Sequence, residues 1–378
     1  MAAFFLILWL AALVFYVLSA CCVRSFFTRE SSRGKRPAKG APPVSVLKPM
    51  KGADAHTYEN LGSFIGQDYP SFQTIFGVAE PDDPAVPVIH RLMAENPGKD
   101  ISLVISNRGA GPNRKVCNLI NMYGSARYDI IVVADGDMRV GPDYLMAVAA
   151  GFDDPGVGLV TCPYRGAHPK GLGGALEALT IDTDFLPSVL VAERLEGLSF
   201  ALGATMAVRR EALEKIGGFA VLADRLADDY WLGNLVKKAG FRLKLSGCLV
   251  DSVQGDEGFK GYFGHQLRWG RTYRVCRPAG YFFSGITKGT ALSVLFLAAS
   301  GFSAAGWAVF SANLVLRYAQ ALYMERYVKG PGVAARLWLL PVKDVISAVI
   351  WFLSFTGDTV AWKGGRFRID REGRMRGI

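Results

Sequence analysis

The first hydrophobic feature of the chain is an uncharged run over residues 2–23 that is rich in Phe, Leu, Ala and Val. At about 1.5 Å per residue, a helix of this length spans the roughly 30 Å hydrocarbon core of a bilayer. No basic residue precedes the run, and it is longer than the apolar part of a signal peptide, which favours an uncleaved anchor. The residues that follow are basic: Arg24, Arg29, Arg33, Lys35, Arg36 and Lys39. The positive-inside rule therefore predicts that everything after Arg24 is cytoplasmic.

Two further apolar stretches lie towards the other end of the chain. Residues 290–316 are uncharged and fit either a single crossing or a helical hairpin that turns near Gly301. Residues 337–355 carry Lys343 and Asp344 near their start, and these two could pair at an interface. The segments around both stretches are basic, including the tail after residue 356. The charge rule therefore favours a cytoplasmic C-terminus but leaves the number of crossings open.

Between residue 44 and about residue 252, short β-branched runs alternate with segments of helical spacing. The strand candidates are 44–47, 73–78, 101–105, 130–134, 158–162 and 241–245, and the helical segments include 58–66, 87–96 and 116–123. This alternation predicts an α/β domain with a mostly parallel sheet and helices on both faces. Such sheets bind ligands beyond the carboxyl ends of their strands, so acidic residues that follow strands are candidate site residues.

Two carboxylates separated by one glycine follow the apolar run 130–134. We expect Asp135 and Asp137 to project into a crevice, where hard oxygen ligands suit Mg²⁺ or Mn²⁺ bridging a diphosphate. The alternative is a simple Asp-Gly turn, because this short motif alone is a weak signal. A second acidic pair, Asp82 and Asp83, follows the strand candidate that ends at residue 78.

A third acidic pair, Asp228 and Asp229, opens a helical segment that runs to Gly240. Acidic residues at this position commonly cap a helix and interact with its dipole. A second carboxylate beside the cap is less easily explained in this way. The functional alternative is a general base for the hydroxyl of a sugar acceptor.

The segment from His265 to Trp269 combines a cation with an aromatic ring. Arg268 offers a planar fork of donors suited to phosphate oxygens, and Trp269 offers a flat face for a sugar or lipid. The same pair could equally be an interfacial membrane anchor. Four basic residues that follow could contact anionic headgroups: Arg271, Arg274, Arg277 and Lys288.

The composition favours a membrane over a nucleic acid as the partner of this basic chain. Of 378 residues, 51% are apolar and only 20% are charged, with a net charge of +10. Such a charge suits nucleic acid or an anionic leaflet. The chain has no zinc-finger spacing and no RNP-like aromatic strand, so we expect no nucleic-acid partner. The six cysteines form no metal-ligand spacing or disulfide framework.

Together, these motifs resemble those of glycosyltransferase families 2 and 21, in which three aspartate motifs precede a Q/RxxRW motif. The similar segments are 44–49, 82–85, 113–115 with 118–119, 135–137, 217–218, 227–230 and 268–269. The resemblance implies a GT-A (Rossmann-like) domain that performs an inverting transfer from a UDP-sugar donor with Mg²⁺ or Mn²⁺. It also implies a membrane lipid acceptor and transmembrane helices at both ends of the chain.

By this resemblance, one group of residues binds the donor. Asp83 looks like the aspartate on the uridine side, and Lys115 looks like a contact of the nucleotide or its phosphates. Asp135 and Asp137 look like the ligands of the metal and the diphosphate.

A second group acts at the acceptor. Asp229 looks like the catalytic base, with Asp228 as its neighbour. Arg268 and Trp269 look like the pair that closes over the diphosphate and the acceptor. His265 stands where the family motif has Gln or Arg, so its acceptor-side role is open.

The match is close to the ceramide glucosyltransferase branch, but that branch has a His-Pro pair where this chain has Leu186-Pro187. Segments 113–116, 185–191 and 265–272 look more like the bacterial hopanoid-biosynthesis branch, which is associated with transfer of N-acetylglucosamine to bacteriohopanetetrol. That likeness implies a multi-pass protein of the bacterial inner membrane with a cytoplasmic catalytic domain. The alternatives are a ceramide glucosyltransferase, a processive polysaccharide synthase or a non-catalytic nucleotide-binding scaffold.

The expected organisation has six parts. They are an anchor at 1–24, a basic cytoplasmic linker at 25–43, the GT-A domain at 44–255, interfacial helices with the HQLRW motif at 256–288, transmembrane helices at 289–356 and a basic cytoplasmic tail at 357–378.

Overall fold

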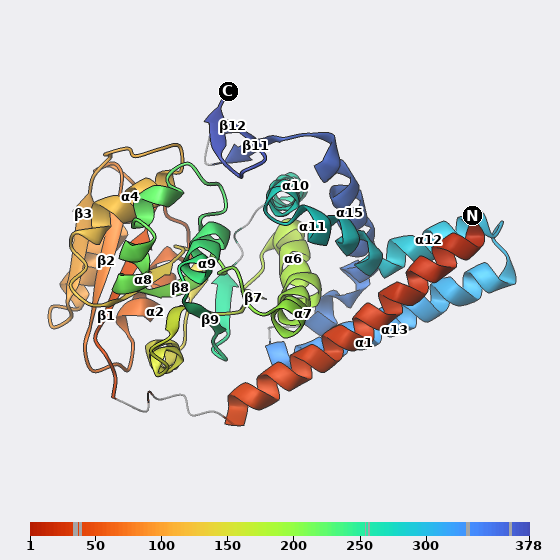
Figure 1. Cartoon of the computed structure of the whole chain (residues 1–378), viewed down its shortest axis with the longest axis horizontal. Coiled ribbons are helices and arrows are strands. Elements are labelled where there is room, and N and C mark those ends of the chain that lie inside the picture. The colour runs from red at the N-terminus through yellow and green to blue at the C-terminus, as the bar shows by residue number, and fades with distance from the viewer. Residues whose placement is uncertain (33–36, 38–39, 254, 256–257, 330–332, 363–364) are drawn as a thin grey trace.

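A computed structural model describes residues 1–32, 37, 40–253, 255, 258–329, 333–362 and 365–378. Figure 1 shows an α/β domain at one end of the molecule and long helices that extend away from it at the other. Four of the basic residues named above lie outside the described residues: Arg33, Lys35, Arg36 and Lys39.

The core of the α/β domain is a seven-stranded sheet in the order β3-β2-β1-β4-β8-β6-β9. The strands are β1 (Val44–Pro49), β2 (Phe72–Val78), β3 (Ile101–Ile105), β4 (Ile130–Ala134), β6 (Val157–Thr161), β8 (Thr205–Arg209) and β9 (Arg242–Leu245). Strand β8 runs antiparallel to its neighbours β4 and β6, and every other neighbouring pair is parallel. The predicted mostly parallel sheet is therefore confirmed, with β8 as the strand that the hydrophobic pattern did not predict.

Helices cover both faces of this sheet, as expected. All five residues of β4 are buried, and successive side chains enter two different cores: Val132 packs on one side and Val133 on the other. This burial on both faces explains why β4 reads as a continuous apolar run. The helices of the domain are α2 (Thr57–Ile65), α3 (Ala85–Glu95), α4 (Arg114–Tyr123), α5 (Tyr144–Ala149), α8 (Arg210–Lys215) and α9 (Asp228–Lys238).

A second layer connects the α/β domain to the long helices. It contains a three-stranded sheet in the order β5-β10-β7, with β5 (Met138–Arg139), β10 (Val250–Val253) and β7 (Tyr164–Ala167). Next along the chain come α6 (Gly171–Thr180), a π-helical turn η2 (Ile181–Phe185) and α7 (Leu186–Glu196). Helix α10 (Phe259–Cys276) packs beside α6, and α11 (Pro278–Phe283) packs against α10 (Figure 1).

The N-terminal helix α1 (Ala2–Ser32) continues eight residues beyond the expected anchor boundary at residue 24. Its apolar N-terminal part contacts α12 and α13, whereas Val23 and Phe26 enter the core of the α/β domain. Arg29 bonds to Glu193 of α7 at 3.2 Å. The end of α1 is thus packed rigidly against the second layer.

Among the residues that the structure describes, two helical segments are long and apolar enough to cross a membrane, 2–31 and 334–356. A third crossing is possible if 278–287 and 289–299, bent by 60° relative to each other, form one span. Helices α12 (Gly289–Ala299) and α13 (Ala304–Val328) form a hairpin that turns at Gly301, where φ is +65°. Of the two possibilities for residues 290–316, the hairpin is therefore the one adopted. Helix α15 (Leu340–Leu353) forms most of the last apolar stretch.

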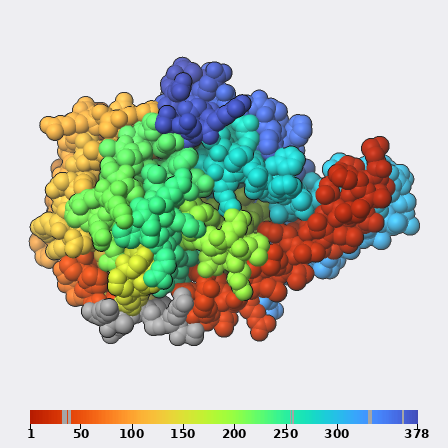
Figure 2. Space-filling view, in the orientation of Figure 1, coloured from red at the N-terminus to blue at the C-terminus, as the bar shows by residue number. Residues whose placement is uncertain are grey.

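The C-terminal residues fold into a third sheet, which the basic composition of the tail did not predict. Its antiparallel strands are β11 (Thr359–Trp362), β12 (Gly365–Ile369) and β13 (Met375–Gly377). Figure 2 shows this dark blue segment lying across the top of the molecule, next to the green surface around α9 and the cyan surface around α10.

Candidate functional site

The site lies where the order of the parallel strands reverses, beyond the carboxyl ends of β1 and β4. Lys48 in β1 is fully buried, and its Nζ donates to the main-chain carbonyl of Asp135 at 2.6 Å. The ammonium also lies 3.8 Å from the ring centroid of Phe64. Burial lowers the pKa of Lys48 to about 7, against the opposing effect of Asp137 and Asp135. The sequence alone does not identify Lys48 as a site residue, because its only signal is a lysine inside an apolar strand.

Lys115 joins two of the acidic motifs. Its Nζ lies 2.7 Å from Asp135 Oδ1 and 3.2 Å from Asp228 Oδ2. Burial alone would lower the pKa of Lys115, but the two carboxylates raise it above its ordinary value. Asn113 places the lysine by capping α4, because its side chain accepts a hydrogen bond from the Val116 amide at 3.1 Å. Three separate motifs of the sequence therefore meet at one ammonium group.

Asp229 stands in the first turn of α9, beside this ion network. Burial raises its pKa to about 6, and the neighbouring charge of Asp228 adds to the effect. The Tyr230 amide donates to Asp229 Oδ1 at 2.7 Å. On the other side the chain passes so close at Gly203 that a Cβ there would lie 2.9 Å from Asp229 Oδ2. The backbone thus confines a carboxylate that is more basic than an ordinary aspartate.

Asp83 organises the turn after β1. Its carboxylate accepts hydrogen bonds from the Gly52 amide at 2.9 and 3.0 Å and from the Ala85 amide at 2.9 Å. Gly52 has a φ of +76°, a conformation that favours glycine. The neighbouring Asp82 is exposed. Asp83 therefore holds the loop around Gly52 at the start of α3.

The Asp135-Gly136-Asp137 turn follows β4 as predicted, with Asp135 half-buried and Asp137 exposed. Within the described residues, no group of three or more His, Cys, Asp or Glu side chains could hold a metal ion. Mg²⁺ usually takes only one or two protein carboxylates and completes its shell with water and substrate phosphates. This turn fits an ion of that kind.

An aromatic wall stands beside Asp229. Trp269 of α10 contacts Phe185 and Tyr273, with centroid distances of 5.8 and 6.1 Å, and Phe185 contacts Tyr164 at 4.9 Å. Burial raises the pKa of Tyr273, and the charge of Asp229 raises it further. The first turn of α9 contacts the end of α10, because the Tyr230 hydroxyl donates to the Cys276 carbonyl at 2.8 Å. We refer to Tyr164, Phe185, Trp269 and Tyr273 as the aromatic wall.

His265 is held by a buried carboxylate that the sequence analysis missed. Its Nδ1 lies 3.1 Å from Glu177 Oε1, and its ring contacts Trp269 at a centroid distance of 4.6 Å. Gln266 Nε2 donates to both Glu177 oxygens at 3.0 Å. Glu177 on α6 therefore orients the first half of the HQLRW segment. Nothing in the local sequence around residue 177 distinguishes it from a surface glutamate.

The basic residues after Trp269 contact protein groups, and the headgroup contacts suggested by the sequence stay a prediction. Arg271 donates to the Thr359 carbonyl, and Arg274 donates to the Gly357 carbonyl at 2.7 Å. Arg277 pairs with Glu196, and Lys288 lies 4.0 Å from Asp184. Because the acceptors lie far along the chain, only the tertiary structure reveals these partners.

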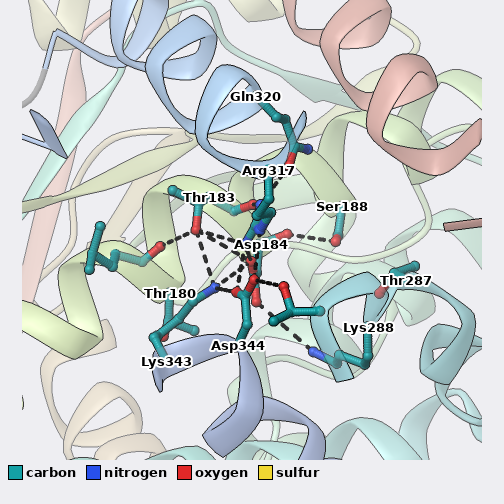
Figure 3. Close-up of polar contacts among 12 residues, drawn as sticks. Thr180, Thr183, Asp184, Ser188, Thr287, Lys288, Arg317, Gln320, Lys343 and Asp344 are labelled. Atoms are coloured by element: carbon teal, nitrogen blue, oxygen red, sulfur yellow. Dashed lines mark hydrogen bonds and ion pairs between the residues drawn. The ribbon is translucent and has the colours of Figure 1, made fainter. Parts of the chain in front are cut away.

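A buried ion network ties the long helices to the π-helical turn next to the aromatic wall (Figure 3). Asp184 in η2 pairs with Arg317 of α13 and, at 2.7 Å, with Lys343 of α15. Asp344 pairs with the same two cations at 3.0 and 2.7 Å. The predicted pairing of Lys343 with Asp344 is confirmed. The network fixes Phe185, which follows Asp184 directly, relative to α13 and α15.

The family Glycosyl transferase family 21 matches residues 4–375, nearly the whole chain. The chain belongs to this family. It is therefore a glycosyltransferase, as its motifs predicted.

Curated relatives of this family 21 chain include ceramide glucosyltransferases. Ceramide glucosyltransferase 1 of Caenorhabditis elegans is 23% identical over 89% of this chain and 73% of the relative. Ceramide glucosyltransferase 3 of the same organism is 28% identical over 54% of this chain, and the match covers 45% of the relative. Ceramide glucosyltransferase of Komagataella phaffii is 31% identical over 35% of this chain and 28% of the relative.

Solved structures with a similar arrangement include a mannosyltransferase from Pyrobaculum calidifontis in complex with GDP-Man and Mn²⁺. It has a TM-score of 0.49 and 19% identity, over 91% of this chain and 99% of that chain. S. aureus TarS in complex with UDP-GlcNAc has a TM-score of 0.40 and 14% identity, over 89% of this chain and 99% of that chain.

Proposed function

We propose that this family 21 glycosyltransferase transfers a sugar from a UDP-sugar to the hydroxyl group of a membrane lipid, with inversion at the anomeric carbon. The observation that carries the proposal is the confined Asp229 carboxylate, whose pKa is about 6, beside the ion network of Lys115. At neutral pH this group is largely deprotonated, yet it is a stronger base than an ordinary aspartate.

The reaction is a single displacement. The lipid oxygen attacks the anomeric carbon and forms the new glycosidic bond, while the bond from that carbon to the diphosphate oxygen breaks. The proton of the lipid hydroxyl passes to Asp229, and UDP leaves with the bonding electrons. One base is sufficient because a single inversion forms no covalent enzyme intermediate. The cations Lys115 and Arg268 would neutralise charge on the departing diphosphate.

Asp135 and Asp137 would hold a divalent cation, Mg²⁺ or Mn²⁺, together with the diphosphate. When bound, such an ion supplies charge neutralisation for the leaving group. Asp135 also carries the Lys115 ion pair, and Lys48 fixes its main chain. These contacts would keep the turn in place before the donor arrives. Asp83 would act on the uridine side through the loop that it organises at Gly52.

A lipid acceptor suits the position of the aromatic wall. Trp269 and Phe185 provide apolar faces, and Phe185 follows Asp184, which pairs with Arg317 of α13 and Lys343 of α15. Aromatic rings of this kind bind sugar and lipid surfaces while their polar edges stay hydrated. The hydroxyl of a lipid could then reach Asp229 while its tail remains among α1, α13 and α15.

We further propose that the transferred sugar is N-acetylglucosamine and that the acceptor lipid is bacteriohopanetetrol. The transfer would take place at the cytoplasmic face of a bacterial inner membrane. Its support is the Leu186-Pro187 pair, which departs from the ceramide pattern, and the resemblance of segments 113–116, 185–191 and 265–272 to the hopanoid branch. Ceramide is the second candidate acceptor, favoured by the curated relatives, which are ceramide glucosyltransferases.

The test is product identification with the purified full chain. The enzyme is supplied with radiolabelled UDP-N-acetylglucosamine or UDP-glucose and with micelles that contain either bacteriohopanetetrol or ceramide. A labelled lipid that disappears in Asp229→Asn and persists in the exposed Asp129→Asn control supports the proposal. A labelled polymer would contradict lipid transfer, and a ceramide product would contradict the hopanoid assignment alone.

A further inference from the structure

A cavity of about 560 Å³ lies between the α/β domain and the C-terminal sheet. Its lining residues are Lys51, Gly109, Gly111, Pro112, Arg114, Trp362, Gly365 and Phe367. The volume falls in the range of small-molecule sites, which is roughly 300–1,000 Å³. Two cations stand on the domain side and two aromatic rings on the sheet side. This combination suits a ligand that has both phosphate groups and a planar ring.

The cavity adjoins the candidate donor residues at two points. Lys51 precedes Gly52, whose amide is held by Asp83. Arg114 precedes Lys115, which pairs with Asp135. The loops that supply the two lining cations are therefore the same loops that carry the expected uridine and diphosphate contacts.

The C-terminal sheet is fixed to the α/β domain beside this cavity. The amide of Met375 donates to the Asp224 carbonyl at 2.7 Å, and the amide of Leu226 donates to the Gly373 carbonyl at 3.3 Å. The turn at Gly373 passes so close to α9 that a Cβ there would lie 2.8 Å from Trp231 Nε1. The C-terminal sheet therefore contacts residues 224–226, and this segment leads directly into Asp228 and Asp229 at the start of α9.

The α/β-domain side of the cavity also contacts residues 223–226, which lead into α9. The amide of Asn113 donates to the Ala223 carbonyl at 2.9 Å, and its side chain donates to the Arg225 carbonyl at 2.7 Å. A Cβ at Gly111 would lie 2.4 Å from the Ala223 carbonyl oxygen, so this loop and residue 223 are in direct contact. Residues 223–226 thus hold both walls of the cavity at a defined separation.

The two aromatic rings lie on the inner side of the sheet. Along β12, Gly365, Phe367 and Ile369 are at least half-buried, whereas Arg366 and Arg368 are exposed. A Cβ at Gly365 would lie 2.7 Å from the Phe367 ring, so the ring covers this glycine. The alternation is that of a strand with one face towards the protein and the other towards solvent.

We propose that the C-terminal sheet forms the outer wall of the donor pocket, with Trp362 and Phe367 stacking on the base of a nucleoside diphosphate and with Lys51 and Arg114 facing its phosphates. This inference rests on the proposed function, because it concerns the same donor. It adds a base-binding element from the last 20 residues of the chain. Stacking on aromatic rings is tolerant of base identity, so selectivity for uracil would come from the loop at Gly52.

The test compares UDP binding and donor kinetics in Trp362→Leu and Phe367→Leu. Leucine keeps apolar contact with the small core around Val360 and Ile369 but has no aromatic face. Loss of a stacked base typically corresponds to a roughly 5- to 150-fold weaker affinity. We therefore expect the Kd of UDP and the KM of the UDP-sugar to rise within this range, while kcat at saturating donor stays near the wild-type value.

Two comparisons separate stacking from a merely structural role. Trp362→Phe retains a ring and is expected to restore most of the affinity, and binding of inorganic pyrophosphate is expected to stay unchanged in all variants. Arg368→Ala, on the outer face of the same strand, serves as the control. Variants that melt like the wild type and bind UDP with unchanged Kd would overturn the inference while leaving the proposed function intact. A wild-type chain that binds no UDP would instead overturn the proposed function.

Discussion

Replacement of Asp229 by asparagine is expected to abolish turnover and to stabilise the folded protein at neutral pH. The carboxylate is deprotonated above about pH 6 in a place where burial and Asp228 oppose its charge. Asparagine has nearly the same shape and can still accept the hydrogen bond from the Tyr230 amide. The substitution therefore removes the charge with little change in packing.

The size of the stabilisation expected from Asp229→Asn follows from the raised pKa of Asp229. The difference between about 6 in the folded protein and the ordinary value of 3.8 corresponds to at most about 3 kcal/mol, at about 1.36 kcal/mol per pH unit. Because the folded state binds the proton more tightly than the unfolded state, wild-type stability falls as pH rises from about 4 to 6. The gain in free energy of unfolding of Asp229→Asn over the wild type should reach its full size above pH 6, about half of that size at pH 5 and zero below pH 4.

Thermal unfolding of the detergent-solubilised chain at pH 5 and pH 8 measures this effect. The melting temperature of Asp229→Asn should exceed that of the wild type more at pH 8 than at pH 5. Turnover should fall by at least about 10²- to 10⁴-fold, with binding of the UDP-sugar retained. The exposed Asp129→Asn should change neither quantity. Equal melting temperatures at both pH values, or wild-type turnover, would refute the reasoning.

A companion variant tests the cause of the raised pKa. Asp228→Asn removes the like charge beside Asp229, so the pKa of Asp229 should fall. If Asp229 is the base, the acidic limb of the pH–rate profile, near pH 6 in the wild type, should move to lower pH. The rate against pH in saturating donor gives the position of this limb. A limb that stays in place would remove Asp229 as the titrating group.

Three further outcomes are expected. Gly203→Ala places a Cβ 2.9 Å from the carboxylate of the base and should reduce kcat by about 10²-fold without weakening UDP binding, measured by steady-state kinetics and calorimetry. Lys48→Met removes the ammonium that holds the Asp135 carbonyl and should raise the Mn²⁺ concentration needed for half-maximal activity by about 10- to 100-fold, measured by metal titration. Asp344→Asn leaves two buried cations with one carboxylate and should destabilise the protein by about 3–5 kcal/mol, whereas the exposed Asp358→Asn should have little effect on melting.

The sequence by itself determined the features that are encoded within a few consecutive residues. The apolar run of β4 and the turn at Asp135 were predictable because a buried parallel strand has an unmistakable pattern and the turn follows directly. The start of α9 at Asp228 was predictable because acidic residues favour the first turn of a helix. The N-terminal helix α1, a candidate membrane span, was predictable from its length and lack of charge.

Only the tertiary structure decided which residues meet. Strand β8 has the sequence TMAVR, in which only Thr205 and Val208 are β-branched, so its local pattern does not identify it. Lys48 and Glu177 look like ordinary charged residues until burial and distant partners give them their contacts. The sheet formed by the tail depends on its contacts with residues 224–226. Helical and strand periodicity is a local property of the chain, whereas burial, ion pairing and the closing of a cavity depend on segments that only folding brings together.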